Sequence, residues 1–254
     1  MTINRAQALG LCGFLINSLA FADGILTPTP HWKLVAGAGG GAAFSDNPGK
    51  SRYFPVTVPG SSQFYYYADR GFTRVKGLFE VFLGAEHPLF SQGVIQPALA
   101  YTQAASYQVK GVLMQGLDVP SSDNFTYQYR VLTRQLMAQS KFMLPFKQSL
   151  YPYLLLGVGA SFNSASQYAT NIPPLLISTR LYQNKQTTAF AYRLGLGVDV
   201  DLFSHVRLGA AYRFTGLGQA CLGNTRIEGS YVPGTLSQPH MAANEVLLQL
   251  TYIG

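Results

Sequence analysis

The 254-residue sequence predicts an all-β fold: a transmembrane, antiparallel, up-and-down β-barrel of eight strands with long external loops. Three observations lead to this prediction. Charged residues make up 11% of the chain, whereas ordinary soluble domains carry about 25%. Several segments alternate between apolar and polar residues at every second position. The connections between these segments are short and long in turn.

The N-terminus has the pattern of an export signal. Arg5 supplies the positive end, Ala8–Ile16 forms a short apolar core, and Ala20-Phe21-Ala22 fits a small-x-small cleavage site. We therefore expect residues 1–22 to be a signal peptide. Residues 23–254 would then form the outer-membrane β-barrel domain, with its N-terminus in the periplasm. The rest of the sequence has no apolar run of about 20 residues, the length of a spanning helix.

The clearest strand is "AFAYRLGLGVDVDLF", residues 189–203. Phe190, Leu196 and Leu202 belong to an unbroken apolar face, and the alternate positions hold small, polar or charged residues. A period of two identifies a strand whose two faces meet different surroundings. Such a strand suits a soluble sheet as well as a barrel in lipid, so the remaining segments decide between them.

Seven further segments have strand character. They cover residues 31–44, 72–86, 92–115, 125–143, 151–163, 206–215 and 244–254. The segment 92–115 is long enough for two strands if the chain turns at 103–106, which would make the total odd. Bacterial single-chain barrels have even strand numbers, so we interpret 92–115 as one strand that projects beyond the bilayer. A ten-stranded barrel is the alternative.

The connections alternate in length along the chain. The short ones are residues 87–92, 144–149 and 203–205, and the longer ones are 45–71, 116–124, 164–188 and 216–243. Outer-membrane barrels have short periplasmic turns and longer external loops. A periplasmic N-terminus makes the first connection external, and that connection is long. The alternation therefore favours a barrel over a soluble sandwich.

With these features the chain resembles the small eight-stranded outer-membrane β-barrel proteins of bacteria, which include opacity-type, OmpA-like and OmpW-like proteins. The segments that carry the resemblance are "LFEVFLGAEHPL" (78–89), "YPYLLLGVGASFN" (151–163), "RLGAAYRF" (207–214) and "VLLQLTY" (246–252). The resemblance implies that the barrel assembly machinery inserts the chain into an outer membrane containing lipopolysaccharide. For OmpW-like proteins it also implies a narrow channel for small or hydrophobic solutes.

The outer face of such a barrel would meet lipid. Apolar residues would face acyl chains, and Tyr and Trp would gather at the two interfaces. The interface candidates are Trp32, Tyr101, Tyr127, Tyr129, Tyr192, Tyr212 and Tyr252.

The inner face would hold the charges. An eight-stranded barrel is only wide enough for side chains to fill it, and charges buried there must pair. The lumen candidates share parity with small residues: Lys33, Glu80, Glu86, Arg130, Arg193, Asp199, Asp201, Arg207 and Arg213. A turn at 203–205 would place Asp201 opposite Arg207. We expect a plug of salt bridges, and a proton or ion path is the alternative.

The first long connection carries the candidate ligand contacts. Lys50, Arg52, Arg70 and Arg74 accompany the aromatic stretch "FYYYADRGF" (64–72). Cations beside aromatic rings can hold lipopolysaccharide phosphates or a host or surface ligand. Ordinary solvation of a loop is the alternative interpretation.

The distribution of charged residues and the positions of the histidines limit the possible functions. The basic residues are scattered, so the net charge of +7 does not predict nucleic-acid binding. His31, His87, His205 and His240 show neither metal-ligand spacing nor a nucleophile–base arrangement, so we expect no enzyme, metal or cofactor. The expected function is structural or surface interaction: envelope integrity, adhesion or host contact through the external loops. The alternatives are the narrow channel and, less favoured, a lipid A-modifying enzyme.

Overall fold

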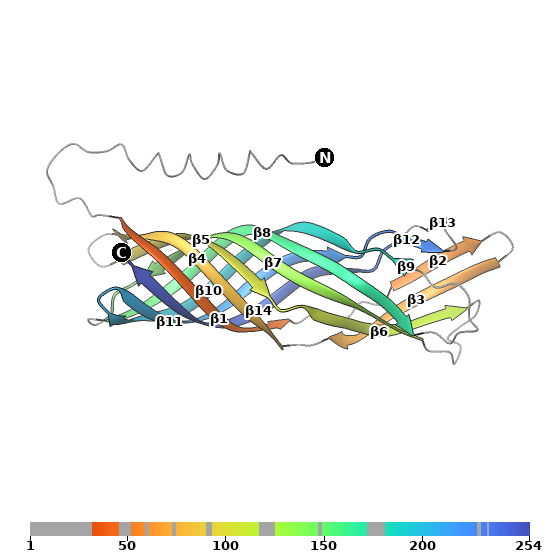
Figure 1. The fold of residues 1–254 in the computed structure, drawn as a ribbon, viewed down its shortest axis with the longest axis horizontal. Helices are drawn as coiled ribbons and strands as arrows, with labels where there is room; N and C mark the ends of the chain where they lie inside the picture. The colour runs from red at the N-terminus through yellow and green to blue at the C-terminus, as the bar shows by residue number, and fades with distance from the viewer. Residues whose placement is uncertain are drawn as a thin grey trace, which may run out of the picture. The chain divides into compact units, whose positions relative to one another are not determined.

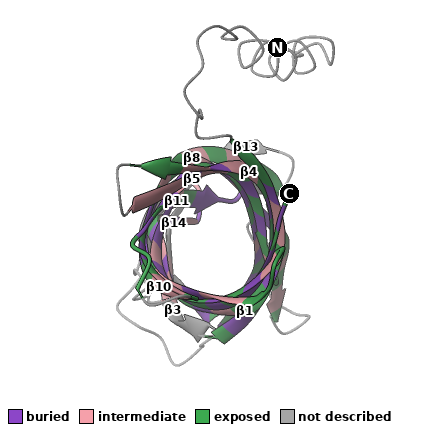
Figure 2. Ribbon diagram, turned by 90° about the vertical axis from the view of Figure 1, so that its left-hand side faces the viewer, coloured by how far each residue is buried: buried purple, intermediate pink, exposed green. Residues whose placement is uncertain are grey.

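Eight strands of the unit Trp32–Gly254 pair edge to edge in an antiparallel ring (Figures 1 and 2). In the computed structural model they are β1 (Lys33–Ser45), β4 (Val75–Leu89), β5 (Gly93–Ala104), β7 (Phe125–Met143), β8 (Leu150–Asn171), β10 (Lys185–Phe203), β11 (Val206–Cys221) and β14 (Ser237–Ile253). Each pairs with the next and β14 pairs with β1, so the ring has no free edge. The predicted eight-stranded antiparallel barrel is confirmed, and the ten-stranded alternative is wrong.

The structure describes only part of the chain. The described residues are 32–45, 52–58, 61–72, 75–89, 93–116, 125–146, 149–171, 181–227, 230–232 and 234–254. The predicted signal peptide, residues 1–22, lies outside them. Among the described residues, no helix is long and apolar enough to cross a membrane.

Further strands extend the barrel wall beyond the ring. They are β2 (Arg52–Val58), β3 (Ser61–Phe72) and β6 (Tyr107–Gly116), and β6 pairs with the N-terminal half of β7. Along β7, Gln103 of β5 lies opposite Arg134, and Tyr107 of β6 lies opposite Val131. Strands β5 and β6 therefore run in one direction along the same neighbour. The segment 92–115 does not turn back, as predicted, but it forms two successive strands that are separated at Ala105–Ser106 instead of one.

Much of what the sequence presents as long connections is sheet. Strand β2 and all of β3 except Phe72 lie within 45–71, and β8 and β10 extend into 164–188. A small sheet of β9 (Leu181–Tyr182), β12 (Thr225–Ile227) and β13 (Ser230–Val232) adds to the same end. Figure 1 shows β2, β3, β6 and this small sheet at the end of the barrel opposite the C-terminus.

The two faces of the ring differ as the period of two predicts. On β10, Leu194 and Leu196 are 52% and 62% exposed, whereas Arg193 and Asp199 are 2% and 0% exposed. Figure 2 shows the same alternation of buried and exposed residues around the ring. Each ring strand exposes large apolar side chains, among them Leu34, Phe79, Leu99, Leu136, Leu154, Leu196, Leu208 and Leu248. An apolar surface of this extent is expected to face lipid.

Polarity reverses along β7. In its C-terminal half, Gln139 is buried and Phe142 is exposed, but in its N-terminal half Tyr127 and Tyr129 are buried and Arg130 is exposed. The expectations that Tyr127 and Tyr129 face an outer interface, and that Arg130 lies in the lumen, are therefore wrong. Beyond the apolar band the outer wall meets water, so aromatic rings turn inward and charges outward. The other interface candidates are exposed: Trp32, Tyr101, Tyr192, Tyr212 and Tyr252.

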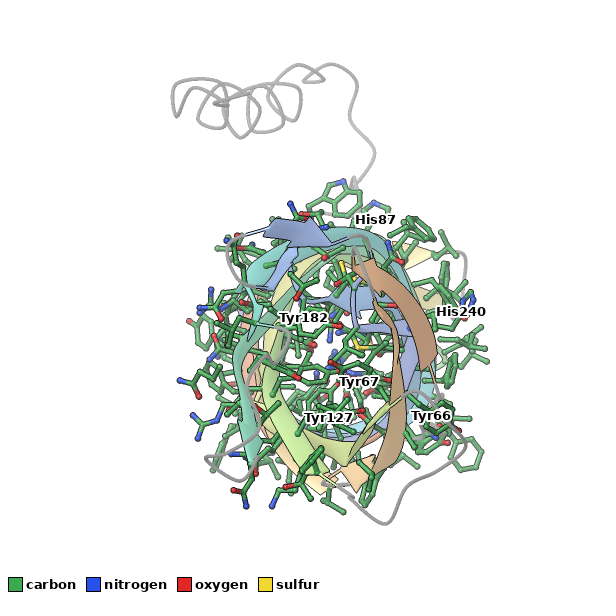
Figure 3. The ribbon with its side chains drawn as sticks, turned by 90° about the vertical axis from the view of Figure 1, so that its right-hand side faces the viewer. Tyr66, Tyr67, His87, Tyr127, Tyr182 and His240 are labelled. Carbon is green, nitrogen blue, oxygen red and sulfur yellow. The ribbon has the colours of Figure 1, made fainter. Side chains whose placement is uncertain are left out.

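The inward rings of the extended end form a compact group, the tyrosine cluster of Tyr67, Tyr127, Tyr129, Tyr168 and Tyr182. Figure 3 labels Tyr67, Tyr127 and Tyr182 of this cluster. Tyr67 and Tyr127 meet edge to face with ring centroids 5.2 Å apart, and Tyr168 and Tyr182 do so at 4.9 Å. Such edge-to-face pairs add to the free energy of apolar burial. Burial, followed by the neighbouring Tyr168 and Tyr182, raises the pKa of Tyr67 above its ordinary value.

The connection between β10 and β11 is tighter than expected. Phe203 pairs with Val206 around a two-residue turn, and the register shifts between Asp201 and Phe203. A one-residue slip would send every following side chain to the opposite face. The irregularity at Leu202 compensates for the shorter turn, so Asp201 still lies opposite Arg207.

Candidate functional site

The centre of the lumen is built around the carboxylate of Glu80 on β4. Arg193 of β10 and Arg213 of β11 donate to Glu80 Oε2 at 2.9 and 2.7 Å, and both ion pairs are fully buried. Thr102 donates to the same oxygen at 2.6 Å, and Gln249 donates to Oε1 at 2.8 Å. One carboxylate therefore binds side chains from four other strands and ties opposite walls of the ring together.

The two arginines have further partners, although Arg193 Nε and Arg213 Nη2 are buried without a hydrogen bond to the described residues. Arg193 donates to Gln139 at 2.6 Å, Gln135 at 2.9 Å and Thr102 at 3.0 Å. Arg213 pairs with Glu245 of β14. Two cations thus face two carboxylates within this central cluster of Glu80, Arg193, Arg213 and Glu245. Pairing of this kind is what allows charges to remain ionised away from water.

A second group of charges lies nearer the turn between β10 and β11. Lys141 Nζ contacts Asp199 Oδ2 at 2.9 Å, and both side chains are buried. Arg207 contacts Glu86 and Asp201, each at 2.8 Å, and its guanidinium lies 4.2 Å from the ring centre of Tyr151. The central cluster and this group fill the lumen at two levels.

The space between the central cluster and the tyrosine cluster is also occupied. Lys76 Nζ donates to Ser45 Oγ at 2.9 Å and lies 3.2 Å from the ring centre of Tyr107. Tyr107 in turn donates to the sulfur of Met241 at 3.1 Å. A cavity of 20 Å³ remains here, which is room for about one water molecule.

The end of β11 bends into the lumen and helps to close it. The β11–β14 register shifts at Gly218, whose φ of 70° favours glycine. Asn163 donates to the carbonyls of Leu217 and Gln219 at 2.8 and 3.0 Å, and Ser161 donates to Leu217 at 2.5 Å. These hydrogen bonds hold Leu217 over the central cluster as a buried apolar residue.

The structure brings together most of the lumen candidates. Seven of them form the ion pairs described above: Glu80, Glu86, Arg193, Asp199, Asp201, Arg207 and Arg213. Arg130 lies outside on the exposed wall, because the outward positions in the N-terminal half of β7 are polar. The expectation for Lys33 is also wrong, since Lys33 is exposed at the start of β1. Two partners were missed, Lys141 and Glu245. Glu245 has the inward parity of Gln249 on the last predicted strand, and Lys141 lies where the sequence alternation is least regular.

The candidate ligand contacts of the first connection are only partly covered by the structure. Lys50 and Arg74 lie outside the described residues, and for Arg52 on β2 and Arg70 on β3 only the backbone is described. Their role stays a prediction. In the part of the chain that the structure describes, no group of three or more His, Cys, Asp or Glu residues is arranged to hold a metal ion.

Neither a protein-family model nor a curated protein sequence matches this chain. Solved structures do. The outer-membrane protein OprG from Pseudomonas aeruginosa is 12% identical with a TM-score of 0.43, over 89% of this chain and 97% of that one. The outer-membrane protease OmpT from Escherichia coli is 7% identical with a TM-score of 0.42, over 91% and 99%. Neisserial surface protein A is 11% identical with a TM-score of 0.39, over 86% and 96%. At these sequence identities and TM-scores the structural similarity supports no inference about function. The fold is established by the strand pairing of this chain.

Proposed function

We propose that this chain is a bacterial outer-membrane β-barrel with a sealed lumen. It would act through its outer wall and external end, in envelope integrity, adhesion or host contact. The observation that carries the proposal is the filled lumen: two levels of paired charges, then the bent end of β11 and the tyrosine cluster. A solute passing through would have to break these contacts.

The outer face supports the membrane location. A closed ring satisfies its own backbone hydrogen bonds, which is the condition for a sheet to lie in lipid. The apolar band would then be buried by acyl chains. A signal peptide at 1–22 and insertion by the barrel assembly machinery belong to the same proposal.

The arrangement of the two ends supports an orientation. The two-residue turn at Ser204–His205 and the C-terminal Ile253 lie at one end, where Ile253 donates its N–H to the carbonyl of His205. The extra strands β2, β3 and β6 lie at the other (Figure 1). Because periplasmic turns are short and external segments are long, we place the turn end in the periplasm and the tyrosine cluster outside.

The alternative function is a narrow channel, and the opening of such a channel would cost free energy. Opening the lumen would separate Glu80 from Arg193 and Arg213, and breaking a buried ion pair costs about 3–5 kcal/mol. Planar-bilayer recording of the purified full chain tests this point. We expect no single-channel steps from the wild type, and leak currents from a Glu80→Ala, Arg193→Ala variant that removes two facing side chains. Stable steps from wild-type protein of correct fold would refute the sealed lumen.

A lipid A-modifying enzyme is the less favoured alternative. Ser204 Oγ lies 2.9 Å from His205 Nδ1, but the two are exposed neighbours in a turn. Within the described ranges, the buried carboxylates are committed to cations. Mass spectra of lipid A from cells with and without the protein should be the same, and a mass difference that depends on the protein would establish an enzyme.

The location has its own test. The protein should appear in the outer-membrane fraction and should migrate faster on a gel when unheated than when boiled, because a closed barrel resists detergent. Recovery from aqueous extract as a detergent-free monomer would refute the location and the lipid-facing band together.

A further inference from the structure

The inward residues of β10 and β11 between the two levels of lumen charges are small. Gly209 lies opposite Asp199 of the second group of charges, and Ala211 lies opposite Gly197. The next inward residue of β11 is Arg213 of the central cluster. We call Gly197, Gly209 and Ala211 the small-residue floor. Because these residues have no side chain or only a methyl group, side chains from the neighbouring strands can lie across the floor.

Polar side chains from three strands are directed onto this floor. A Cβ atom at Gly209 would meet Asp199 Oδ1, and one at Gly197 would meet the hydroxyl of Tyr153. Tyr153 of β8 lies opposite Gly197, and its hydroxyl interacts electrostatically with charges of both levels. Gln249 of β14 lies opposite Gly209 on the other side of β11. The floor is therefore the place where the two levels of charges approach each other.

Four polar atoms around the floor have no hydrogen-bond partner among the described residues. They are Asp199 Oδ1, Gln249 Oε1, Arg213 Nη2 and the hydroxyl oxygen of Tyr153. Each of these four residues is at most 5% exposed. A buried polar atom without a partner is costly, and nearly all such atoms in native proteins are paired with protein or with ordered water. Four of them around one floor indicate a bound partner.

The kinds of atom identify the chemical class of that partner. Asp199 would repel an anion and Arg213 would repel a cation. Both are already balanced, Asp199 by Lys141 and Arg213 by Glu80 and Glu245, so a further ion would be buried without a counter-charge. Water is neutral, donates twice and accepts twice, and a buried water molecule typically makes about three hydrogen bonds. Carboxylate and amide oxygens beside a guanidinium and a phenol supply both kinds of partner.

We propose that the small-residue floor binds ordered water that joins the two levels of lumen charges. The water donates to Asp199 Oδ1 and Gln249 Oε1, and it accepts from Arg213 Nη2 and from the Tyr153 hydroxyl. The central cluster and the second group of charges then belong to one hydrogen-bonded network. This inference concerns the interior of the barrel and does not depend on where the barrel acts.

Replacement of Tyr153 by Phe separates a hydrated floor from a dry one. The purified full chain is refolded into phospholipid vesicles and unfolded with urea. Where water accepts from the hydroxyl, the substitution removes a hydrogen bond and should lower the unfolding midpoint. A hydroxyl buried without any partner would give the opposite result, because its removal ends the cost of desolvation. The matched control is Tyr252→Phe, which alters an exposed tyrosine and should leave the midpoint unchanged.

Nuclear magnetic resonance detects the water directly. In the full chain in detergent micelles, we expect cross-peaks between long-lived water and the backbone amide protons of Gly209 and Ala211. The control amide is that of Gly37, an inward glycine of β1 that is covered by the ring of Phe82. It should show no such cross-peak, because an apolar ring leaves water no hydrogen-bond partner.

Several results would overturn the inference. One is the absence of water cross-peaks at both floor amides, and another is a Tyr153→Phe midpoint at or above that of the wild type. An equal loss in Tyr252→Phe would show a general effect of phenol hydroxyls. A wild-type midpoint that depends on the identity of the salt ions at constant ionic strength, and no longer does so in Tyr153→Phe, would show a bound ion. Heat-shifted gel mobility confirms that each variant has folded.

Discussion

Replacement of Glu80 by Gln is the sharpest test of the paired lumen. The substitution keeps the size of the side chain and removes one negative charge at a fully buried position. Arg193 and Arg213 would lose the carboxylate that they share, and only Glu245 would remain to balance two guanidinium groups in the central cluster. The amide that replaces the carboxylate would also direct an N–H donor toward the N–H donors of the two arginines.

The expected cost follows from this uncompensated charge. Removing one partner of a buried ion pair destabilises a protein by about 3–5 kcal/mol, a large share of the roughly 5–15 kcal/mol that keeps a domain folded. The matched control is Thr102→Val, which removes a neutral donor to the same carboxylate at 2.6 Å. It should cost about 1.5–3 kcal/mol, because Thr102 donates to a carboxylate and accepts from Arg193. Adding Arg193→Met to Glu80→Gln restores charge balance, so the double variant should be more stable than the sum of its single changes by roughly 1–3 kcal/mol.

The assay is reversible urea unfolding of protein refolded into phospholipid vesicles, with the folded fraction taken from gel mobility without heating. The free energies of unfolding of the wild type, the three single variants and the double variant complete the comparison. If Glu80→Gln costs no more than Thr102→Val, or if the two changes in the double variant simply add, the carboxylate does not balance the charge of the arginines.

Three further predictions use the same unfolding assay. Leu196→Arg, on the exposed apolar face, should cost about 2–4 kcal/mol in vesicles, and a neutral effect would show that this face does not meet lipid. Arg130→Gln should leave the unfolding midpoint unchanged because Arg130 is exposed, whereas Arg213→Gln should lower it strongly; equal effects would contradict the placement of the two residues. Burial raises the pKa of Tyr67 above its ordinary 10.0, so above that pH the unfolded chain releases a proton that the folded chain keeps, and stability falls as pH rises. Tyr67→Phe should reduce this alkaline loss, and an unchanged pH dependence between pH 9 and about 11 would count against the buried tyrosine cluster.

Which charged residues pair with one another in the lumen could be determined only from the closed ring of strands. Period-two parity placed Glu80, Arg193 and Arg213 on one face, where the structure also has them, but these residues are separated by 113 and 133 positions in the sequence. Only the order of strands around the ring and their register decide which carboxylate meets which guanidinium. Asp201 and Arg207 were an easier pair, because they flank a single turn.

The sequence by itself determined the class of fold and the face of each strand in the apolar band, because lipid and lumen impose opposite demands on alternate residues. Tertiary structure alone decided where the band ends. Beyond that level the outer wall meets water instead of lipid, and the interior holds aromatic rings instead of charges. The polar positions there point outward and the aromatic positions inward, which is why Tyr127 and Tyr129 are buried and Arg130 is exposed. The alternation in a strand's sequence shows that its two faces differ. Which of the two faces points into the lumen follows only from where each residue lies along the barrel axis.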